Sequence, residues 1–177
     1  MGCEITSGYN KVCDSPGGVD TFYAFAVKDS SGESNYADNG LVIADGQVTT
    51  LTLKTGKYAF AFNVEIETAS FTDTKGGERT AGAYSRTQAG TVMLHGNTAS
   101  MITDIEAMAK GRHAIIAKLN DDSYELFFAE NGAVASDERA TGTAYEDMNG
   151  TTITFAGKEK IKACKISSTI VEALLAP

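Results

Sequence analysis

Few side chains in this sequence have the types and spacing that catalysis or metal binding requires. The two histidines, His95 and His113, are the available general bases, and each stands at the end of a predicted strand. No serine lies in the nucleophile motif of the α/β-hydrolases, and no cysteine and histidine have the spacing of a zinc site. We therefore expect strand-end imidazoles, no catalytic residues and no enzyme.

Carboxylates give two weaker candidates for a cation site. Glu65, Glu67 and Asp73 have a spacing that could place them on one face of a long strand and its continuation. Nothing in the sequence gives them the contrasting environments that separate an acid from a base. Residues 146–150 are similar to the start of a calcium loop, but Ala156 stands where that loop needs a glutamate. The sequence thus favours a solvated strand face and a hairpin turn, with no metal and no cofactor.

Composition indicates a single folded domain, residues 1–177. Hydrophobic residues make up 42% of the chain and charged residues 21%, which is ordinary for a globular protein. Fifteen Lys and Arg against 23 Asp and Glu give a net charge of −8, so the average surface repels nucleic acid. No apolar stretch is long enough for a membrane span. The three cysteines, Cys3, Cys13 and Cys164, suit free thiols in a reducing compartment, so we expect the chain to stay in the cytoplasm or to leave it by lysis.

Turn residues recur at short intervals and separate apolar runs, the pattern of hairpins in a β-sandwich or barrel. Nine strands are predicted, at residues 22–27, 41–43, 48–53, 58–68, 91–95, 112–119, 124–128, 150–155 and 160–166. The fold class is therefore mainly β (α+β): an antiparallel β-sandwich or barrel of about nine strands with one packed α-helix and a long protruding β-hairpin.

Residues 100–110 are predicted to form that helix. Met101, Ile105 and Met108 recur at helical spacing. Ser100 can cap the start, and Gly111 can leave the helix in the left-handed conformation.

Residues 58–68 are predicted to form one unusually long strand. Every even position carries Tyr, Phe, Val, Ile or Thr, and the odd positions between them are small or polar. Residues 78–90, which should pair with this strand, have almost no large apolar side chains. The two segments together suggest a hairpin arm, about 58–90, that needs a neighbouring subunit to cover it. A C-terminal arm, about 167–177, is a second candidate for docking on a neighbour.

Several short stretches of the chain form recognisable motifs. They are Met1-Gly2-Cys3-Glu4-Ile5 with Gly8, Cys13 and Gly17-Gly18-Val19; residues 67–74; Ala109-Lys110-Gly111-Arg112; Glu130-Asn131-Gly132; and Gly142 with residues 147–155 and Glu159. Together they resemble a family of virion structural proteins from tailed phages of Bacteroides-type bacteria, and in particular tail tube proteins. The chain departs from that family at Phe127-Phe128-Ala129, where a glycine is commoner, and in the charges of Asp137-Glu138-Arg139.

The resemblance implies a tail tube subunit that forms stacked hexameric rings around a DNA conduit. Its partners would be copies of itself and other virion tail or head proteins, with DNA passing without specific binding, and its location would be the virion tail. Phe71 would lie near the hairpin tip and anchor in the next ring. The subunit-contact residues predicted on this basis are Tyr58, Phe60, Phe62, Phe71, Tyr84, Leu174 and Leu175.

Two alternatives remain open at this point. The first is a capsid decoration or head-tail joining protein with the same acidic β-domain. The second is a cellular ligand-binding or carbohydrate-binding β-domain, in which exposed aromatics such as Tyr9, Tyr36 and Tyr145 would have to converge on one site.

Overall fold

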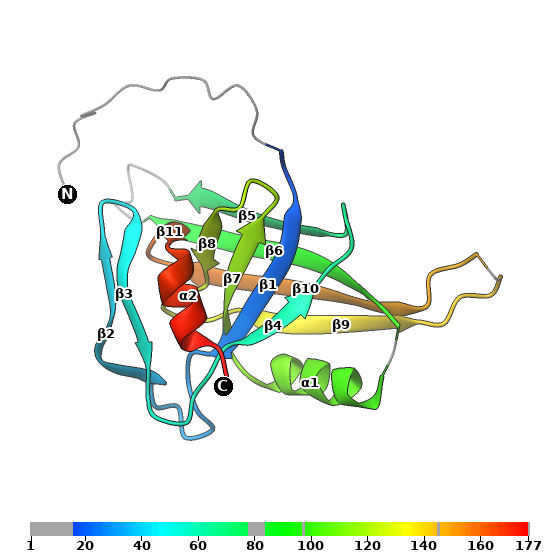
Figure 1. Cartoon of the computed structure of the whole chain (residues 1–177), viewed down its shortest axis with the longest axis horizontal. Coiled ribbons are helices and arrows are strands. Elements are labelled where there is room, and N and C mark those ends of the chain that lie inside the picture. The colour runs from blue at the N-terminus through cyan, green and yellow to red at the C-terminus, as the bar shows by residue number, and fades with distance from the viewer. Residues whose placement is uncertain (1–15, 78–83, 97, 145, 177) are drawn as a thin grey trace.

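A computed structural model of the chain describes residues 16–77, 84–96, 98–144 and 146–176. Two β-sheets, of seven and four strands, pack face to face (Figure 1). The strands are β1 (Val19–Ala26), β2 (Tyr36–Ala44), β3 (Gln47–Leu53), β4 (Phe60–Asn63), β5 (Ala69–Gly76), β6 (Ser85–His95), β7 (His113–Leu119), β8 (Tyr124–Phe127), β9 (Val134–Ala140), β10 (Gly150–Glu159) and β11 (Cys164–Ile166), and the helices are α1 (Ala99–Lys110) and α2 (Ser168–Leu174).

The large sheet has the strand order β2-β3-β11-β8-β7-β1-β4, and the small sheet has the order β5-β6-β10-β9. All neighbours are antiparallel except β3 and β11. Neither sheet closes on itself, so the predicted mainly β sandwich is confirmed, while the barrel form is not.

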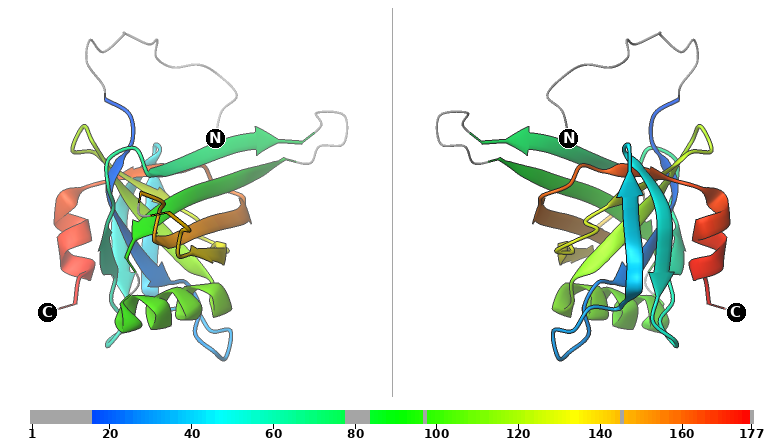
Figure 2. Two further views of the ribbon diagram at one scale, coloured as in Figure 1. Left: turned by 90° about the vertical axis from the view of Figure 1, so that its right-hand side faces the viewer. Right: turned by 90° about the vertical axis from the view of Figure 1, so that its left-hand side faces the viewer.

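The central strands of the large sheet are buried on both faces, which explains their nearly continuous apolar sequences. Phe22 of β1 and Ile115 of β7 point into the core between the two sheets. Phe25 of β1 and Ile116 of β7 point to the opposite face, where a second cluster includes Val171 and Leu174 of α2. The molecule therefore has three layers: the small sheet, the large sheet and α2. Figure 2 shows α2 and the β5–β6 hairpin on opposite sides of the large sheet.

Helix α1 lies across one end of the sandwich (Figure 1), and its predicted range is confirmed. Its buried residues are Ile105 and Met108. The cap differs from the prediction, because the Thr98 side chain, and not Ser100, accepts the backbone N–H of Met101. Gly111 is in an extended conformation, so the predicted left-handed exit is wrong. A glycine is needed there for space, since a Cβ would lie 2.6 Å from Cε1 of His113.

The long strand predicted at residues 58–68 is wrong, because the chain turns within it. β4 stops at Asn63 and pairs with β1 in the large sheet, whereas β5 belongs to the small sheet. The intervening turn has Glu67 at φ 64°, and Thr68 donates from both its backbone N–H and its Oγ1 to the carbonyl oxygen of Glu65. The period-two pattern is interrupted here, since Ile66 is 80% exposed.

The protruding hairpin exists, but its strands are β5 and β6, with Ser70 opposite Thr91 and Gly76 opposite Ser85. The predicted pairing of residues 58–68 with 78–90 is therefore wrong, and residues 78–83 lie outside the described residues. Phe71 is not near the tip. It faces Gly90 across the pair, and its ring centroid lies 5.3 Å from that of Phe127 in the core. A Cβ on Gly90 would lie 2.2 Å from the Phe71 ring, so this glycine makes room for the aromatic side chain.

The described residues form eleven strands, whereas nine were predicted for the chain. The two that sequence patterns missed are β5, rich in Ser and Thr, and β9, whose sequence includes Asp137-Glu138-Arg139. Both are edge strands of the small sheet, and edge strands often carry polar or charged side chains.

The C-terminal segment packs on its own subunit. α2 buries Val171 and Leu174, and the carbonyl oxygen of Leu174 accepts the N–H of Ala59 at 2.8 Å. Neither helix in the described part of the chain is long and apolar enough to cross a membrane.

Candidate functional site

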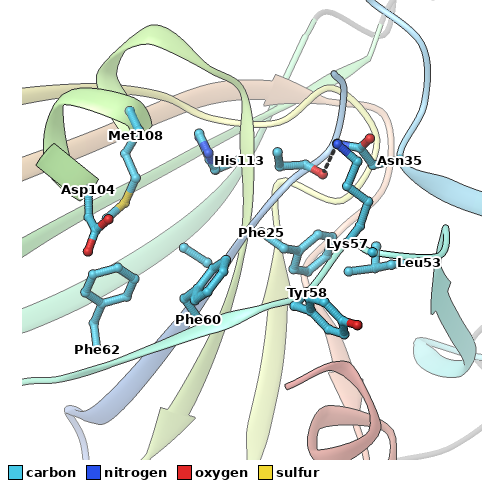
Figure 3. A pocket seen from close by; sticks show the side chains of 14 residues that line it. Phe25, Asn35, Leu53, Lys57, Tyr58, Phe60, Phe62, Asp104, Met108 and His113 are labelled. Atoms are coloured by element: carbon cyan, nitrogen blue, oxygen red, sulfur yellow. Dashed lines mark hydrogen bonds between the residues drawn. The ribbon is translucent and has the colours of Figure 1, made fainter. Parts of the chain in front are cut away.

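An apolar groove of about 270 Å³ runs beside β4, the edge strand of the large sheet. We call it the β4 groove. Its walls are Tyr58, Phe60 and Phe62 on one side and Met108 of α1 on the other, with His113 between them (Figure 3). Phe25 lies at its base. The groove exists because α1 crosses the end of the sandwich near β4 and does not fill the space beside it.

Two of the three aromatic side chains in the wall of the β4 groove are exposed, although large aromatic side chains are usually buried. Phe62 is anchored, because its ring stacks on Phe22 at 4.9 Å with the planes 10° apart. Phe60 and Tyr58 extend this wall outward, and they are 58% and 40% exposed. Large apolar side chains that gather at a sheet edge are a common sign of an interaction surface.

Few polar groups line the β4 groove. Nδ1 of His113 is buried and has no hydrogen-bond partner among the described residues. Burial lowers the pKa of His113, and the nearby backbone of Met108 partly offsets that effect. Asn35 donates from Nδ2 to the carbonyl oxygen of Ala26 at 3.0 Å, so this amide is already engaged (Figure 3). The groove thus presents a neutral, mainly apolar surface between two charged ends.

Those charged ends are Lys57 and Asp104. Lys57 lies at the end of the groove near Tyr58, and Asp104 lies beside α1 near Phe62 (Figure 3). Lys57 and Asp104 lie at opposite ends of the groove, and neither belongs to an ion pair among the described residues.

The structure brings together three of the seven predicted subunit-contact residues, namely Tyr58, Phe60 and Phe62. Tyr84 lies apart, immediately before β6 on the side of the β5–β6 hairpin where the two strands are connected, and Nζ of Lys75 is 4.6 Å from its ring centroid. Tyr84 is exposed and stays a candidate contact.

The remaining three predicted contacts are engaged within the subunit. Phe71 packs on Phe127 and Phe155 in the core. Leu174 is 4% exposed, and Leu175 is partly buried against the same cluster. A neighbour could reach Leu174 only if this packing opened, whereas Phe71 and Leu175 are partly buried and keep some exposed surface.

The carboxylates that suggested a cation site do not converge. Asp73 accepts two hydrogen bonds from Nε of Arg86, at 2.8 and 2.9 Å, and one from the N–H of Ala163. Glu65 and Glu67 lie in the exposed turn before β5. Within the described ranges, no group of three or more His, Cys, Asp or Glu side chains is placed to hold a metal ion.

Of the three aromatics proposed for sugar stacking, the structure describes Tyr36. Tyr36 is largely buried, and its hydroxyl donates to the carbonyl oxygen of Ala129 at 2.6 Å. Tyr9 and Tyr145 lie outside the described residues. Of the three cysteines, the structure describes Cys164, which is a buried free thiol as expected.

The sequence pattern did not predict that Met108 and His113 line a groove with the aromatic residues of the segment 58–62, which is distant from them in the sequence. Met108 was predicted to pack on a sheet, and His113 was predicted to be a strand-end imidazole. The one available signal was the run of aromatics in residues 58–62, which the sequence pattern predicts as subunit contacts but assigns to a protruding arm.

Comparisons of the chain with protein families, with curated proteins and with solved structures find no match. The functional argument therefore depends on the site and on the motifs described above.

Proposed function

We propose that this chain is a virion structural protein of a tailed phage, the subunit of a tail tube that assembles with copies of itself through the β4 groove. The observation that carries the proposal is the aromatic wall of Tyr58 and Phe60, exposed beside an unfilled apolar groove. Burying one such side chain contributes about 1.5–3 kcal/mol, so this surface supplies a driving force for association. The motifs that resemble tail tube proteins support this kind of assembly.

The charge of the chain supports a conduit for DNA. A net charge of −8 disfavours the phosphate contacts that would hold a passing duplex. Assembly of the subunit in the host cytoplasm and residence in the virion tail are part of the same proposal. No catalytic step is assigned to the protein.

The experiment that tests self-assembly replaces Phe60 with Asp. Phe60→Asp puts a charge into the aromatic wall, and because Phe60 is exposed, the fold of the monomer is expected to survive. The matched control is Val134→Asp, because Val134 on β9 is also apolar and is 52% exposed. Size-exclusion chromatography with light scattering and negative-stain microscopy should show ring-based particles for the wild type and for Val134→Asp, and monomers for Phe60→Asp.

Two outcomes would contradict the proposal in different ways. Wild-type protein that remains monomeric at high concentration would remove self-assembly altogether. Particles of unchanged size and number from Phe60→Asp would remove the β4 groove from the interface and leave self-assembly in place.

A ligand-binding domain is the second candidate, because the β4 groove is apolar and its volume of about 270 Å³ is close to the lower end for small-molecule sites. The two functions are distinguishable. A ligand-binding domain keeps its groove open in a stable monomer, whereas a tube subunit covers it on assembly.

A further inference from the structure

We infer that the β4 groove of one copy receives the Ile66 side chain of a second copy, so that subunits join head to tail. This inference rests on the proposed function, since it names the segment that fills the groove. It is carried by three features of the described residues: the exposure of Ile66, the construction of its turn, and the charges on either side.

Ile66 is the most exposed large apolar side chain in the described part of the structure, at 80%. It lies at the centre of the turn between β4 and β5 and makes no contribution to either core cluster. A single exposed isoleucine is ordinary, but Ile66 lies in a turn whose conformation is fixed by hydrogen bonds.

The turn around Ile66 is fixed by local contacts. Oγ1 of Thr68 donates to the carbonyl oxygen of Glu65 at 2.7 Å, and the Thr68 N–H donates to the same oxygen at 3.3 Å. Glu67 has φ 64°, a left-handed conformation that is unfavourable for a residue other than glycine. The neighbouring Val64 packs against the core and anchors the start of the turn. Ile66 is therefore presented on a fixed projection, which we call the Ile66 knob (residues 65–67).

Charges on the knob complement charges at one end of the groove. Glu65 and Glu67 flank Ile66, and both are exposed. Lys54 and Lys57 lie in the turn that leads to β4, where the N–H of Lys57 donates to the carbonyl oxygen of Lys54. None of these four side chains takes part in an ion pair among the described residues. Lys57 lines the groove and Lys54 belongs to the same turn, so the two carboxylates of an incoming knob meet a positively charged end of the groove.

Asp104 gives this contact a direction. It lies at the α1 end of the groove, so the two glutamates of an incoming knob are repelled from that end and attracted to the Lys57 end (Figure 3). One apolar side chain enters the groove, and its charged neighbours remain at the rim, where they are exposed to solvent.

The knob and the groove lie on one subunit and differ from each other. The Ile66 knob follows the end of β4, and the lysine turn precedes its start. When two copies do not return the contact to each other, it is heterologous, and repetition of it produces a closed ring or an open helical filament. An isologous pairing of two grooves would instead stop at a dimer.

The test is complementation between two assembly-defective variants. Ile66→Asp removes the knob and keeps the groove, while Phe60→Asp damages the groove and keeps the knob. Each variant alone is expected to be monomeric. Mixed together, the Phe60→Asp copy supplies the knob and the Ile66→Asp copy supplies the groove, so sedimentation velocity should show a 1:1 heterodimer that grows no further.

The double variant Phe60→Asp/Ile66→Asp is the matched control, because it has neither surface and should form no heterodimer with either single variant. A Lys57→Glu change added to the Ile66→Asp copy should weaken the heterodimer about tenfold or more, and Glu65→Lys with Glu67→Lys on the Phe60→Asp copy should restore it.

The outcomes separate this inference from the proposed function. If Ile66→Asp assembles as well as the wild type while Phe60→Asp does not, the groove is an interface but Ile66 does not fill it, and the inference is overturned. Absence of a heterodimer from the two monomeric variants overturns it as well. A wild type that never assembles overturns the proposed function, and with it the inference.

Discussion

Glu159 shows how a single buried carboxylate shapes the loop behind the core. It is 2% exposed and accepts backbone hydrogen bonds from Glu130 and Asn131. In the same loop Phe128 has φ 57°, and its N–H donates to Oε1 of Gln88. A glycine, which the resembled family more often carries in this stretch, adopts this conformation without strain. The contacts from Glu159 and Gln88 therefore hold a loop that its own residues do not favour.

We expect Glu159→Ala to lower the free energy of unfolding by about 1–3 kcal/mol, because the N–H groups of Glu130 and Asn131 lose their acceptor. Urea unfolding followed by circular dichroism measures the change. Glu130→Ala, which removes an exposed side chain and keeps the backbone N–H, is the control and should change the free energy little. An equal effect of both variants would show that the buried carboxylate does not hold this loop.

The pH dependence of the same site has a definite sign. Burial raises the pKa of Glu159, and the N–H groups of Asn131 and Glu130 oppose the increase. In the window between its unfolded and folded pKa values the folded chain therefore binds more protons at this group than the unfolded chain does. The wild type should exceed Glu159→Gln in free energy of unfolding by the largest amount below the ordinary glutamate pKa, about 4.3. This difference should decrease as the pH rises through the raised pKa of Glu159. A difference that stays constant, or grows with pH, would contradict this assignment.

At the scale of single elements, α2 is a structural layer of its own subunit. Its buried residues Val171 and Leu174 cover the face of the large sheet that includes Val48 and Leu51. The parallel bridge between Ala59 and Leu175 attaches its end to the segment just before β4. α2 therefore supports the base of the aromatic wall.

We expect Leu174→Ala to destabilise the monomer by about 2–5 kcal/mol, because it leaves a cavity under α2. Thermal or urea unfolding of an assembly-defective background, Phe60→Asp, measures the monomer without interference from association. Glu172→Ala on the exposed face of the same helix is the control. If the C-terminal segment were instead a free arm that docks on a neighbour, Leu174→Ala would not change the stability of the monomer. That result would contradict the packing of α2 on its own subunit.

The β5–β6 hairpin is also more firmly attached than the sequence suggested. Phe71 packs against core aromatics, Asp73 pairs with Arg86 across the two strands of the hairpin, and Asp73 also accepts the N–H of Ala163, which lies outside the hairpin. Removal of β5 would expose the core between the sheets. Consequently, assembly is better probed by surface changes at Phe60 and Ile66 than by deletion of this hairpin.

At the scale of the whole molecule, the net charge of −8 determines how the protein meets DNA. We expect no measurable binding of duplex DNA at about 0.15 M salt, for assembled wild type and for monomeric Phe60→Asp alike, because neither form neutralises phosphates. Fluorescence anisotropy with a labelled duplex measures this. A dissociation constant of about 1 µM or tighter, which falls in the range of nonspecific DNA-binding proteins, would contradict a conduit through which DNA slides.

The sequence by itself determined the features that depend only on residues close to one another in the chain. The range of α1 follows from the periodicity of Ile105 and Met108, and most strands follow from apolar runs between turn residues. The same local reading identified Tyr58, Phe60 and Phe62 as a candidate contact surface. These features depend on residues within a few turns of helix or one strand, so the sequence pattern carries them directly.

Only the tertiary structure decided which surfaces are covered and which are left open. The alternation of residues 58–68 is the same whether the chain runs straight or turns at Glu67, and the direction of β5 depends on its partner β6. The β4 groove is formed by β4 on one side and by α1 and His113 on the other, two parts of the chain that are distant in the sequence. Phe71 and Phe60 are equally apolar, yet packing buries the first and exposes the second, because burial depends on long-range contacts that no local pattern records.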